Sequence, residues 1–317
     1  MKKILWMCLC GIVASLAACE IDKDKKEEGD EPVDPPVEVP EAYSYLVNSI
    51  VRVQETVVAS TGEREIDTET YSYTYDELNR IVKVREDETL NNGSKEYREE
   101  YYTYEGRKIF SRSSSSYDND EVDDAVYTLG TDDNIIDYKI QEFESGSRSW
   151  ETKGSLFYDS DGYVMAAAMT VVNSDNETED ERDEAVWKDG NLVRVYDEYL
   201  GEGRENVYSE MSYENPEYVN NPDINLDLNF VVCDTEWLDC FAFSGRYIKP
   251  YGHIGKRSKN YMTREYDSSN GNYFIYEYEF DERGLPVKVR KKRYEAQEKP
   301  YFSKDEITYT ITYKTVQ

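Results

Sequence analysis

The sequence predicts an all-β protein. We expect an antiparallel meander of repeated hairpins that forms a large curved sheet or a barrel-like array in water, with one irregular insertion that contains a short helix. Three observations predict this class. Polar turns recur along the chain, apolar and polar residues alternate between them, and 14% of the residues are aromatic. Alternation with period two is typical of half-buried strands.

The first 18 residues have the pattern of an export signal. A short basic start is followed by an uncharged, mostly apolar stretch from Ile4 to Ala18. This stretch is shorter than the roughly 20 residues of a membrane-spanning helix and suits a secretion signal. Leu16-Ala-Ala-Cys19 resembles the bacterial lipobox. We therefore predict a lipoprotein signal peptide over 1–18 and lipid attachment at Cys19; the alternative is an ordinary signal with a nearby cysteine.

Residues 19–41 form an acidic tether with four prolines and no aromatic residue. Such a composition predicts an extended, solvated segment. The charge run directly after Cys19 resembles export signals of Bacteroides-type lipoproteins, which implies an anchor in the outer membrane that faces the cell exterior. The alternative is a plain spacer.

Residues 42–317 are predicted to form a single domain, a hairpin array. Its turns share an aromatic or apolar residue, a polar stretch with Asp, Asn or Gly, and a second apolar residue. They span 75–81, 104–109, 129–135, 158–164, 187–192 and 280–285. Turns that recur at nearly but not strictly regular intervals along a chain are typical of arrays of two-stranded units. Tyr71, Tyr73 and Tyr75 share one parity, as do Tyr276, Tyr278 and Phe280, so both sets are predicted to lie on one face.

Two stretches interrupt the array. Residues 173–184 are nearly all polar and are expected to form an exposed loop. The irregular segment at about 215–263 lacks the hairpin pattern, and we expect its helix within 224–244. It contains Cys233 and Cys240, which an oxidising compartment would allow to pair in a disulfide.

Charge excludes several classes of function. The chain has 67 acidic and 37 basic residues, and loss of Lys2 and Lys3 with the signal leaves 35 basic residues and a net charge of −32. Such a chain repels phosphate backbones, so a nucleic-acid partner is not expected. Dense charge on both parities around 283–293 also argues against a lipid-facing barrel.

The turns resemble, loosely, the tyrosine–aspartate repeats of bacterial surface polymers and toxins. The chain more closely resembles a family of Bacteroides-type lipoproteins of unknown function with a porin-like fold. The residues that carry this resemblance are Cys19, the turns at Tyr75 and Tyr158, and the segments 221–226 and 255–260. The resemblance implies a large curved antiparallel sheet over most of 43–317 and brings no catalytic residue.

No candidate site for chemistry stands out. The acidic stretches 118–124 and 173–184 lack the glycine of a helix–loop–helix calcium site. His253 is the only histidine, and the spacing of the sequence suggests no catalytic partner for it. We predict no catalytic residue, no metal and no cofactor, although a pair of carboxylates that hydrolyses glycosides stays open.

The aromatic residues carry the functional prediction. Trp150, Trp187 and Trp237 are candidates for a platform that stacks on sugar rings. We therefore expect a non-catalytic, lipid-anchored surface protein that binds carbohydrate. The alternative is a structural or accessory component that docks to an outer-membrane transporter or another envelope protein.

Overall fold

The structure is a computed structural model that describes residues 43–90, 93–116, 122–144, 147–199, 207–233, 251–296 and 301–316. The chain divides into two units, Met1–Pro35 and Pro36–Gln317, and every described residue belongs to the second. The strands in the described ranges are β1 (Tyr45–Val58), β2 (Arg64–Tyr75), β3 (Ile81–Thr89), β4 (Lys95–Glu105), β5 (Lys108–Ser115), β6 (Val122–Leu129), β7 (Ile135–Glu144), β8 (Ser147–Tyr158), β9 (Val164–Asn173), β10 (Thr178–Lys188), β11 (Asn191–Tyr199), β12 (Val207–Ser212), β13 (Arg264–Asp267), β14 (Tyr273–Phe280), β15 (Pro286–Tyr294) and β16 (Phe302–Thr315).

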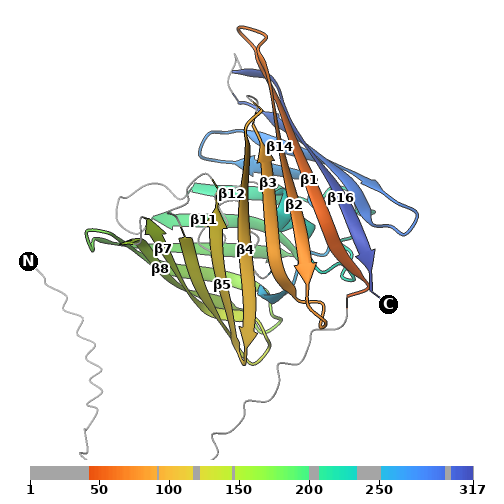
Figure 1. Cartoon of the computed structure of the whole chain (residues 1–317). Helices are drawn as coiled ribbons and strands as arrows, with labels where there is room; N and C mark the ends of the chain where they lie inside the picture. Colours follow the sequence, from red (N-terminus) through yellow and green to blue (C-terminus); the bar gives the residue numbers. More distant parts are fainter. Residues whose placement is uncertain are drawn as a thin grey trace, which may run out of the picture. The chain divides into compact units, whose positions relative to one another are not determined.

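The strands form a closed antiparallel barrel. Each strand pairs with its neighbours in the chain (Figure 1), and β1 pairs with β16 to close the ring, with Ile50 opposite Ile311. The all-β meander is therefore confirmed, and it is a barrel rather than an open sheet. The helix α1 (Leu228–Val232) lies inside the range where a helix was predicted, and η3 (Tyr251–His253) is a single 3-10 turn. Within the described ranges, no helix has the length and apolar character needed to span a membrane.

One end of the barrel carries tight turns with a common hydrogen-bonding scheme. We call it the tight-turn end; it contains the turns 76–80, 106–107, 130–134, 159–163, 189–190 and 281–285. In the first of these turns, Asp76 Oδ1 accepts the backbone N–H groups of Leu78 and Arg80, both at 2.9 Å. Asp159 and Asp281 make the same bonds. An aspartate that caps its own turn explains why Asp follows the aromatic residue in the sequence pattern.

An aromatic residue where a strand reaches the tight-turn end ties that strand to an earlier one. Its hydroxyl or indole N–H donates to a backbone carbonyl of that earlier strand, close to the residue at which the earlier strand begins at the tight-turn end. These bonds, 2.6 to 2.8 Å long, are Tyr75 to Val47, Tyr104 to Ile81, Tyr158 to Ile135, Trp187 to Val164, Tyr213 to Leu192 and Tyr313 to Pro286. The repeated aromatic residue is therefore a structural lock between neighbouring hairpins.

The irregular segment plugs the tight-turn end. We define the plug as residues 213–233 and 251–263, which lie in the sequence between β12 and β13. Its apolar side chains share one core with inward-facing strand residues. The fully buried members of this core include Val47, Ile50, Ile109, Ile135 and Val289 from strands and Ile224, Leu226, Leu228, Val232 and Tyr261 from the plug.

Part of the plug crosses the turns as a strap. The strap, residues 253–259, donates from the Lys256 N–H to the Gly162 carbonyl and from the Lys259 N–H to the Gly190 carbonyl, both at 2.8 Å. These bonds bind the plug to two separate turns of the barrel end. They give the Gly255–Asn260 stretch a structural role.

Gly255 is the point where the strap comes closest to the barrel. Its φ is +79°, and a Cβ added there would lie 2.5 Å from the Gly162 carbonyl oxygen. Both the left-handed backbone and the close approach require glycine at this position.

The loop expected over 173–184 is wrong for most of its length. Only the turn after Asn173 is irregular, and β10 begins at Thr178 and pairs with β9. The residues 178–184 are mostly exposed on both faces. A strand near the rim that is solvated on both sides has no apolar alternation, so the sequence carries no strand pattern there.

Candidate functional site

Several of the residues singled out by the sequence lie outside the described ranges. These are Cys19, Trp237 and Cys240, so lipid attachment, one platform residue and the disulfide stay predictions. Cys233 follows α1, and its thiol lies 3.4 Å from Glu265 Oε1.

The two described tryptophans have different environments. Trp187 is half-buried, packs against the core and donates its indole N–H to the Val164 carbonyl at 2.7 Å. Its ring also contacts Tyr163, with centroids 4.6 Å apart. Trp150 is 46% exposed and has the same parity in β8 as the buried Leu156. Trp187 thus serves a hairpin lock, and only Trp150 offers a free ring face.

His253 is part of the strap. Its Nδ1 lies 2.8 Å from the Asp133 carbonyl oxygen, and burial lowers the pKa of the imidazole. The ring is therefore neutral at pH 7, and Nδ1–H donates to the backbone. This geometry gives the histidine a structural bond to a turn.

The acidic stretches considered for calcium are structural where they are described. The Asn173 side-chain oxygen accepts the N–H groups of Asp175 and Glu177 and so caps its own turn. Asp123 on β6 pairs with Arg98 on β4, across the intervening strand β5. In the part of the chain that the structure describes, no group of three or more His, Cys, Asp or Glu side chains is placed to hold a metal ion.

Inward-facing tyrosines of the barrel bond to buried carboxylates. Tyr276 is 2% exposed, and its hydroxyl donates to Glu265 Oε2 at 2.6 Å. Burial, followed by the charge of Glu265, raises the Tyr276 pKa well above its ordinary value. In the same way, Tyr71 donates to Glu69 at 2.6 Å, and Arg52 neutralises that carboxylate. These hydroxyls and carboxylates satisfy one another, as buried polar groups must.

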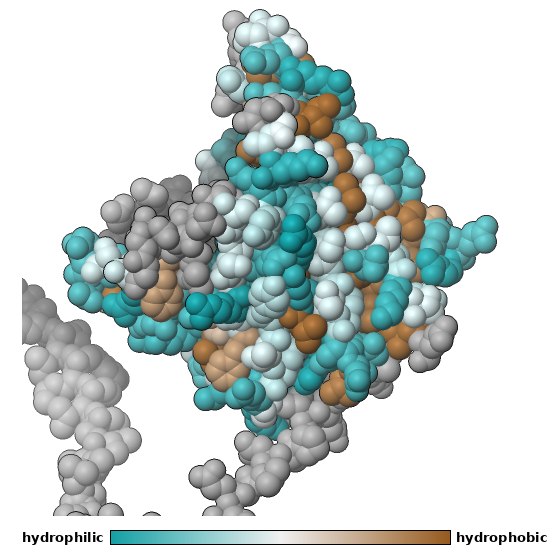
Figure 2. All heavy atoms as spheres, viewed as in Figure 1, coloured by the Kyte–Doolittle hydropathy of each residue, from teal (hydrophilic) through white to brown (hydrophobic). Residues whose placement is uncertain are grey.

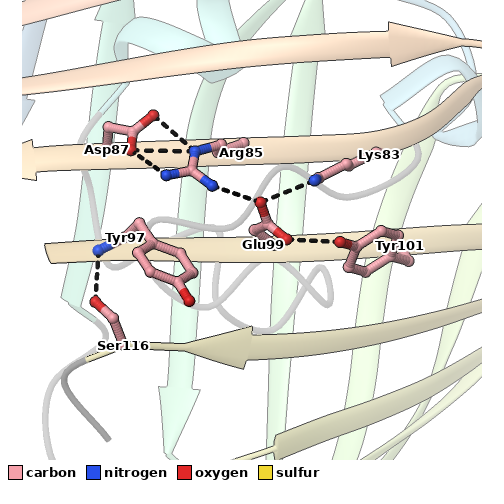
Figure 3. A network of polar contacts seen from close by, with 7 residues as sticks. All are labelled: Lys83, Arg85, Asp87, Tyr97, Glu99, Tyr101 and Ser116. Carbon is pink, nitrogen blue, oxygen red and sulfur yellow. Dashed lines mark hydrogen bonds and ion pairs between the residues drawn. The ribbon is translucent and has the colours of Figure 1, made fainter. Parts of the chain in front are cut away.

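The outer face of the barrel carries charged networks, of which Figure 3 shows one on β3 and β4. Glu99 accepts hydrogen bonds from Lys83, Arg85 and the Tyr101 hydroxyl at 2.6 to 2.8 Å. The bonds from Lys83 and Tyr101 contribute most to lowering the Glu99 pKa to about 2. The Arg85 guanidinium lies 4.6 Å from the ring centroid of Tyr97. The Lys83 ammonium lies 4.9 Å from the ring centroid of Tyr101, so a ring face and the hydroxyl of Tyr101 are both engaged within the network.

Other parts of the outer face are polar as well. Glu151 on β8 is surrounded by Lys139, Arg148 and Lys153 at 2.6 to 3.2 Å. The strands nearest the viewer in Figure 2 are dominated by hydrophilic residues, with hydrophobic ones in scattered spots. A lipid-facing band of a membrane barrel is apolar, whereas the face in this view carries apolar residues only in scattered spots.

A continuous row of tyrosines crosses five neighbouring strands on the outer face. The tyrosine row consists of Tyr196 on β11, Tyr208 on β12, Tyr266 on β13, Tyr273 on β14 and Tyr294 on β15. Tyr196 pairs with Tyr208, Tyr266 with Tyr273, and Tyr273 with Tyr294 across the ladder. The ring centroids of Tyr208 and Tyr266 are 6.4 Å apart, which joins the two halves of the row. A residue adjacent to each of the first three tyrosines is fully buried (Val195, Ser209 and Glu265), so the row points outward.

The hydroxyl groups of this row are largely unused by the protein. The Tyr196 hydroxyl accepts a bond from Arg194 at 2.7 Å. Within the described ranges, the hydroxyls of the other four members make no hydrogen bond to another protein group. All five rings are half-buried or exposed, and Tyr294 is 40% exposed. The row therefore combines fixed rings with hydroxyls that can donate to and accept from a ligand.

The tyrosine row was not predicted from the sequence, because the predicted platform residues were tryptophans. The signal was present: Tyr208, Tyr266 and Tyr294 each lie at the parity opposite to the buried residues of their strands. The alignment of the five positions depends on the pairing register, however, and no local pattern of residues gives that register across the irregular segment.

Comparisons with solved structures agree with this barrel. A porin-like protein from Bacteroides uniformis superposes with a TM-score of 0.58 at 14% identity, over 86% of this chain and 98% of that chain. A porin-like protein from Bacteroides vulgatus gives a TM-score of 0.52 at 13% identity, over 86% of this chain and 99% of that chain. No protein-family model and no curated protein matches the sequence. At these identities the likeness establishes the fold, an antiparallel barrel, and nothing further.

Proposed function

We propose that the protein is a lipid-anchored, non-catalytic barrel of the outer membrane that faces the cell exterior and binds carbohydrate through the tyrosine row. The observation that carries the binding proposal is the row itself: aligned, outward rings with four hydroxyls that the described protein groups leave unused. Aromatic side chains that combine an apolar body with a polar tip are well suited to ligands that do the same.

The anchor rests on the sequence. The basic start, the short apolar stretch and Leu16-Ala-Ala-Cys19 support lipidation at Cys19, and the acidic run after it supports export to the outer surface. Two or more acyl chains give stable attachment, so no membrane-spanning segment is needed. The polar outer face of the barrel is consistent with a domain held in water beside the membrane.

Two cell experiments test the anchor. Cys19→Ala should abolish incorporation of labelled palmitate, and persistent label would contradict the lipid site. Protease added to intact cells should remove the barrel domain. Protection in intact cells, with digestion after lysis, would contradict the exterior location.

A non-catalytic role is supported by the environment of the groups that could perform chemistry. The single histidine is half-buried and bonded to a backbone carbonyl. The buried carboxylates Glu69 and Glu265 are bonded to tyrosine hydroxyls. A general base needs a reachable proton on a substrate, and these groups are committed to the fold.

Binding can be tested on a broad glycan array with the full chain. We expect at least one carbohydrate class to bind, and the double variant Tyr266→Ala with Tyr273→Ala to lose it by about tenfold or more. The matched control is Tyr97→Ala with Tyr101→Ala, two exposed outer tyrosines on β4 that lie outside the row. An array without any bound glycan, or equal loss in both variants, would contradict the proposal.

A second function, docking to an envelope partner, is favoured by one observation. Phe157, Met165 and Val186 lie on the neighbouring strands β8, β9 and β10 and are 52%, 38% and 41% exposed. Grouped exposed apolar side chains are a feature of docking surfaces. A photo-crosslinking residue at position 157 in living cells should then capture one envelope protein, and the same residue at the exposed position 301 should not. No adduct at 157 would contradict docking there.

A further inference from the structure

We propose that the ligand of the tyrosine row is a neutral, linear polysaccharide that lies across the strands and is recognised by its hydroxyl groups at the tyrosine edges. This inference rests on the proposed carbohydrate binding and adds the ligand's charge, its shape and the mode of contact.

The shape follows from the direction of the row. Its members occupy five consecutive strands, and three directly opposed pairs keep the rings aligned across the ladder. Neighbouring strands are about 4.8 Å apart, so the four spacings of the row span roughly 19 Å. An extended sugar chain advances by a similar length per unit, so about one sugar unit meets each strand. A compact or branched sugar would contact only part of the row.

The mode of contact follows from what covers the ring faces. Tyr273 and Tyr294 are stacked on each other, with centroids 4.9 Å apart and planes at 6°. The Arg264 guanidinium lies 4.5 Å from the Tyr273 centroid. Stacked neighbours and a guanidinium occupy the faces on which a sugar ring would lie flat. The ring edges and hydroxyls are left for the ligand.

The same holds at the other end of the row. The Arg194 guanidinium lies 5.5 Å from the Tyr196 centroid and 4.9 Å from the Tyr208 centroid. Arg194 is also paired with Glu210. The carboxylate of Glu210 therefore neutralises the guanidinium that covers these ring faces. The remaining N–H groups of Arg194 can donate to sugar hydroxyls.

The ligand's charge follows from the protein's own. The chain has a net charge of −30, or −32 after loss of the signal. A polyanion approaching the row meets long-range repulsion that salt screens only beyond about 10 Å at 0.1 M. Carboxylates beside the row are already paired with the protein's own cations: Glu210 with Arg194, Glu184 with Arg182 and Glu277 with Lys292, which weakens their attraction for a polycation. Sugar hydroxyls, in contrast, match the unused tyrosine hydroxyls.

Calorimetric titration with defined oligosaccharides tests the length and the charge. The probes are neutral linear glucans and mannans of increasing length, from disaccharide to octasaccharide, and oligogalacturonate as the charged control. We expect affinity to rise by about tenfold or more from disaccharide to pentasaccharide and then to level off. Equal affinity for disaccharide and pentasaccharide, or tighter binding of oligogalacturonate at low salt, would overturn the inference while carbohydrate binding stands. If no oligosaccharide binds, both fail.

A pair of substitutions tests the mode of contact. Tyr208→Phe with Tyr266→Phe removes two hydroxyls and keeps both rings, and we expect affinity to fall by about tenfold. Tyr97→Phe with Tyr101→Phe is the matched control and should leave binding unchanged. If the Phe variant binds as the natural protein does and only the corresponding Ala variant loses binding, the rings act by stacking. Edge recognition would then be wrong, and the proposed function would stand.

Discussion

Tyrosines on the inside and on the outside of this barrel are used in opposite ways. Inside, Tyr276 and Tyr71 donate to buried carboxylates, and Tyr158 donates to a backbone carbonyl. Outside, four hydroxyls of the tyrosine row make no bond to the described part of the protein. The difference teaches that composition alone does not identify a binding aromatic residue. A tyrosine whose hydroxyl is bonded within the protein stabilises the fold. An unused hydroxyl is available to a ligand only where the ring is also exposed, because Tyr278 is buried and its hydroxyl has no partner within the described ranges.

Alkaline titration should give the largest difference between the inner tyrosines and the outer ones. Burial raises the pKa of Tyr102, Tyr127, Tyr276 and Tyr278 well above the ordinary value of 10. The stability that these groups contribute as neutral phenols is complete below pH 10 and is lost as the pH rises above it, because only the unfolded state ionises them. Each group then costs about 1.4 kcal/mol per pH unit.

The measurement is tyrosinate absorbance against pH, with urea unfolding at each pH. We expect one fraction of the tyrosines to ionise only when the barrel unfolds. Ionisation of all tyrosines near pH 10 in a barrel that stays folded would contradict the inner assignment.

Truncation of an inner tyrosine should be the next largest effect. Tyr276→Ala opens a cavity at a site that is 2% exposed and removes the donor to Glu265. We expect the free energy of unfolding to fall by about 3–5 kcal/mol. Tyr294→Ala in the outer row is the control; it loses only the stack on Tyr273 and should lower the free energy of unfolding by about 1 kcal/mol. Urea denaturation measures both, and equal losses would remove the distinction between the two faces.

Removal of a single locking hydroxyl should have a smaller effect. Tyr158→Phe leaves the Ile135 carbonyl at the tight-turn end without its side-chain donor. We expect a loss of about 1–3 kcal/mol in the free energy of unfolding. Tyr101→Phe, which removes a bond to Glu99 on the outer face, is the matched control. A larger loss for the control would show that the locks are not what joins the hairpins.

The smallest effect is expected from the row. Tyr273→Phe removes a hydroxyl that bonds to no described protein group. The free energy of unfolding should therefore change by no more than about 0.5 kcal/mol, the range of neutral surface substitutions. Calorimetry measures the shift. A substantial loss of stability would mean that the row serves the fold.

The local features of this barrel could be predicted from the sequence. Tyr71, Tyr73 and Tyr75 share the inner face because strand parity is a local property. The aspartate turns could be predicted for the same reason, since Asp76 bonds to backbone groups within four residues.

The features that depend on distant pairing could not be predicted. Closure rests on Ile50 opposite Ile311, which no local pattern specifies. The plug looked irregular because its apolar residues follow the shape of the barrel end rather than a strand or helix period. The row was missed because its alignment depends on the register across the plug.

The plug closes the tight-turn end of this barrel. Apolar plug residues such as Leu226 and Leu228 share a core with inward strand residues such as Ile50 and Val289. A barrel whose tight-turn end is packed in this way presents its outer face and rim to partners. The outer face is therefore where the tyrosine row acts in our account.

Chemical footprinting of the tyrosines tests the central claim most directly. The folded full chain is treated with a tyrosine-nitrating reagent, with and without a bound neutral oligosaccharide, and the modified positions are identified by mass spectrometry. We predict nitration of the tyrosine row, protection of that row by the oligosaccharide, and no modification of Tyr102, Tyr127 or Tyr276. Nitration of these inner tyrosines in the folded protein, or a row that the bound oligosaccharide leaves unprotected, would contradict the account.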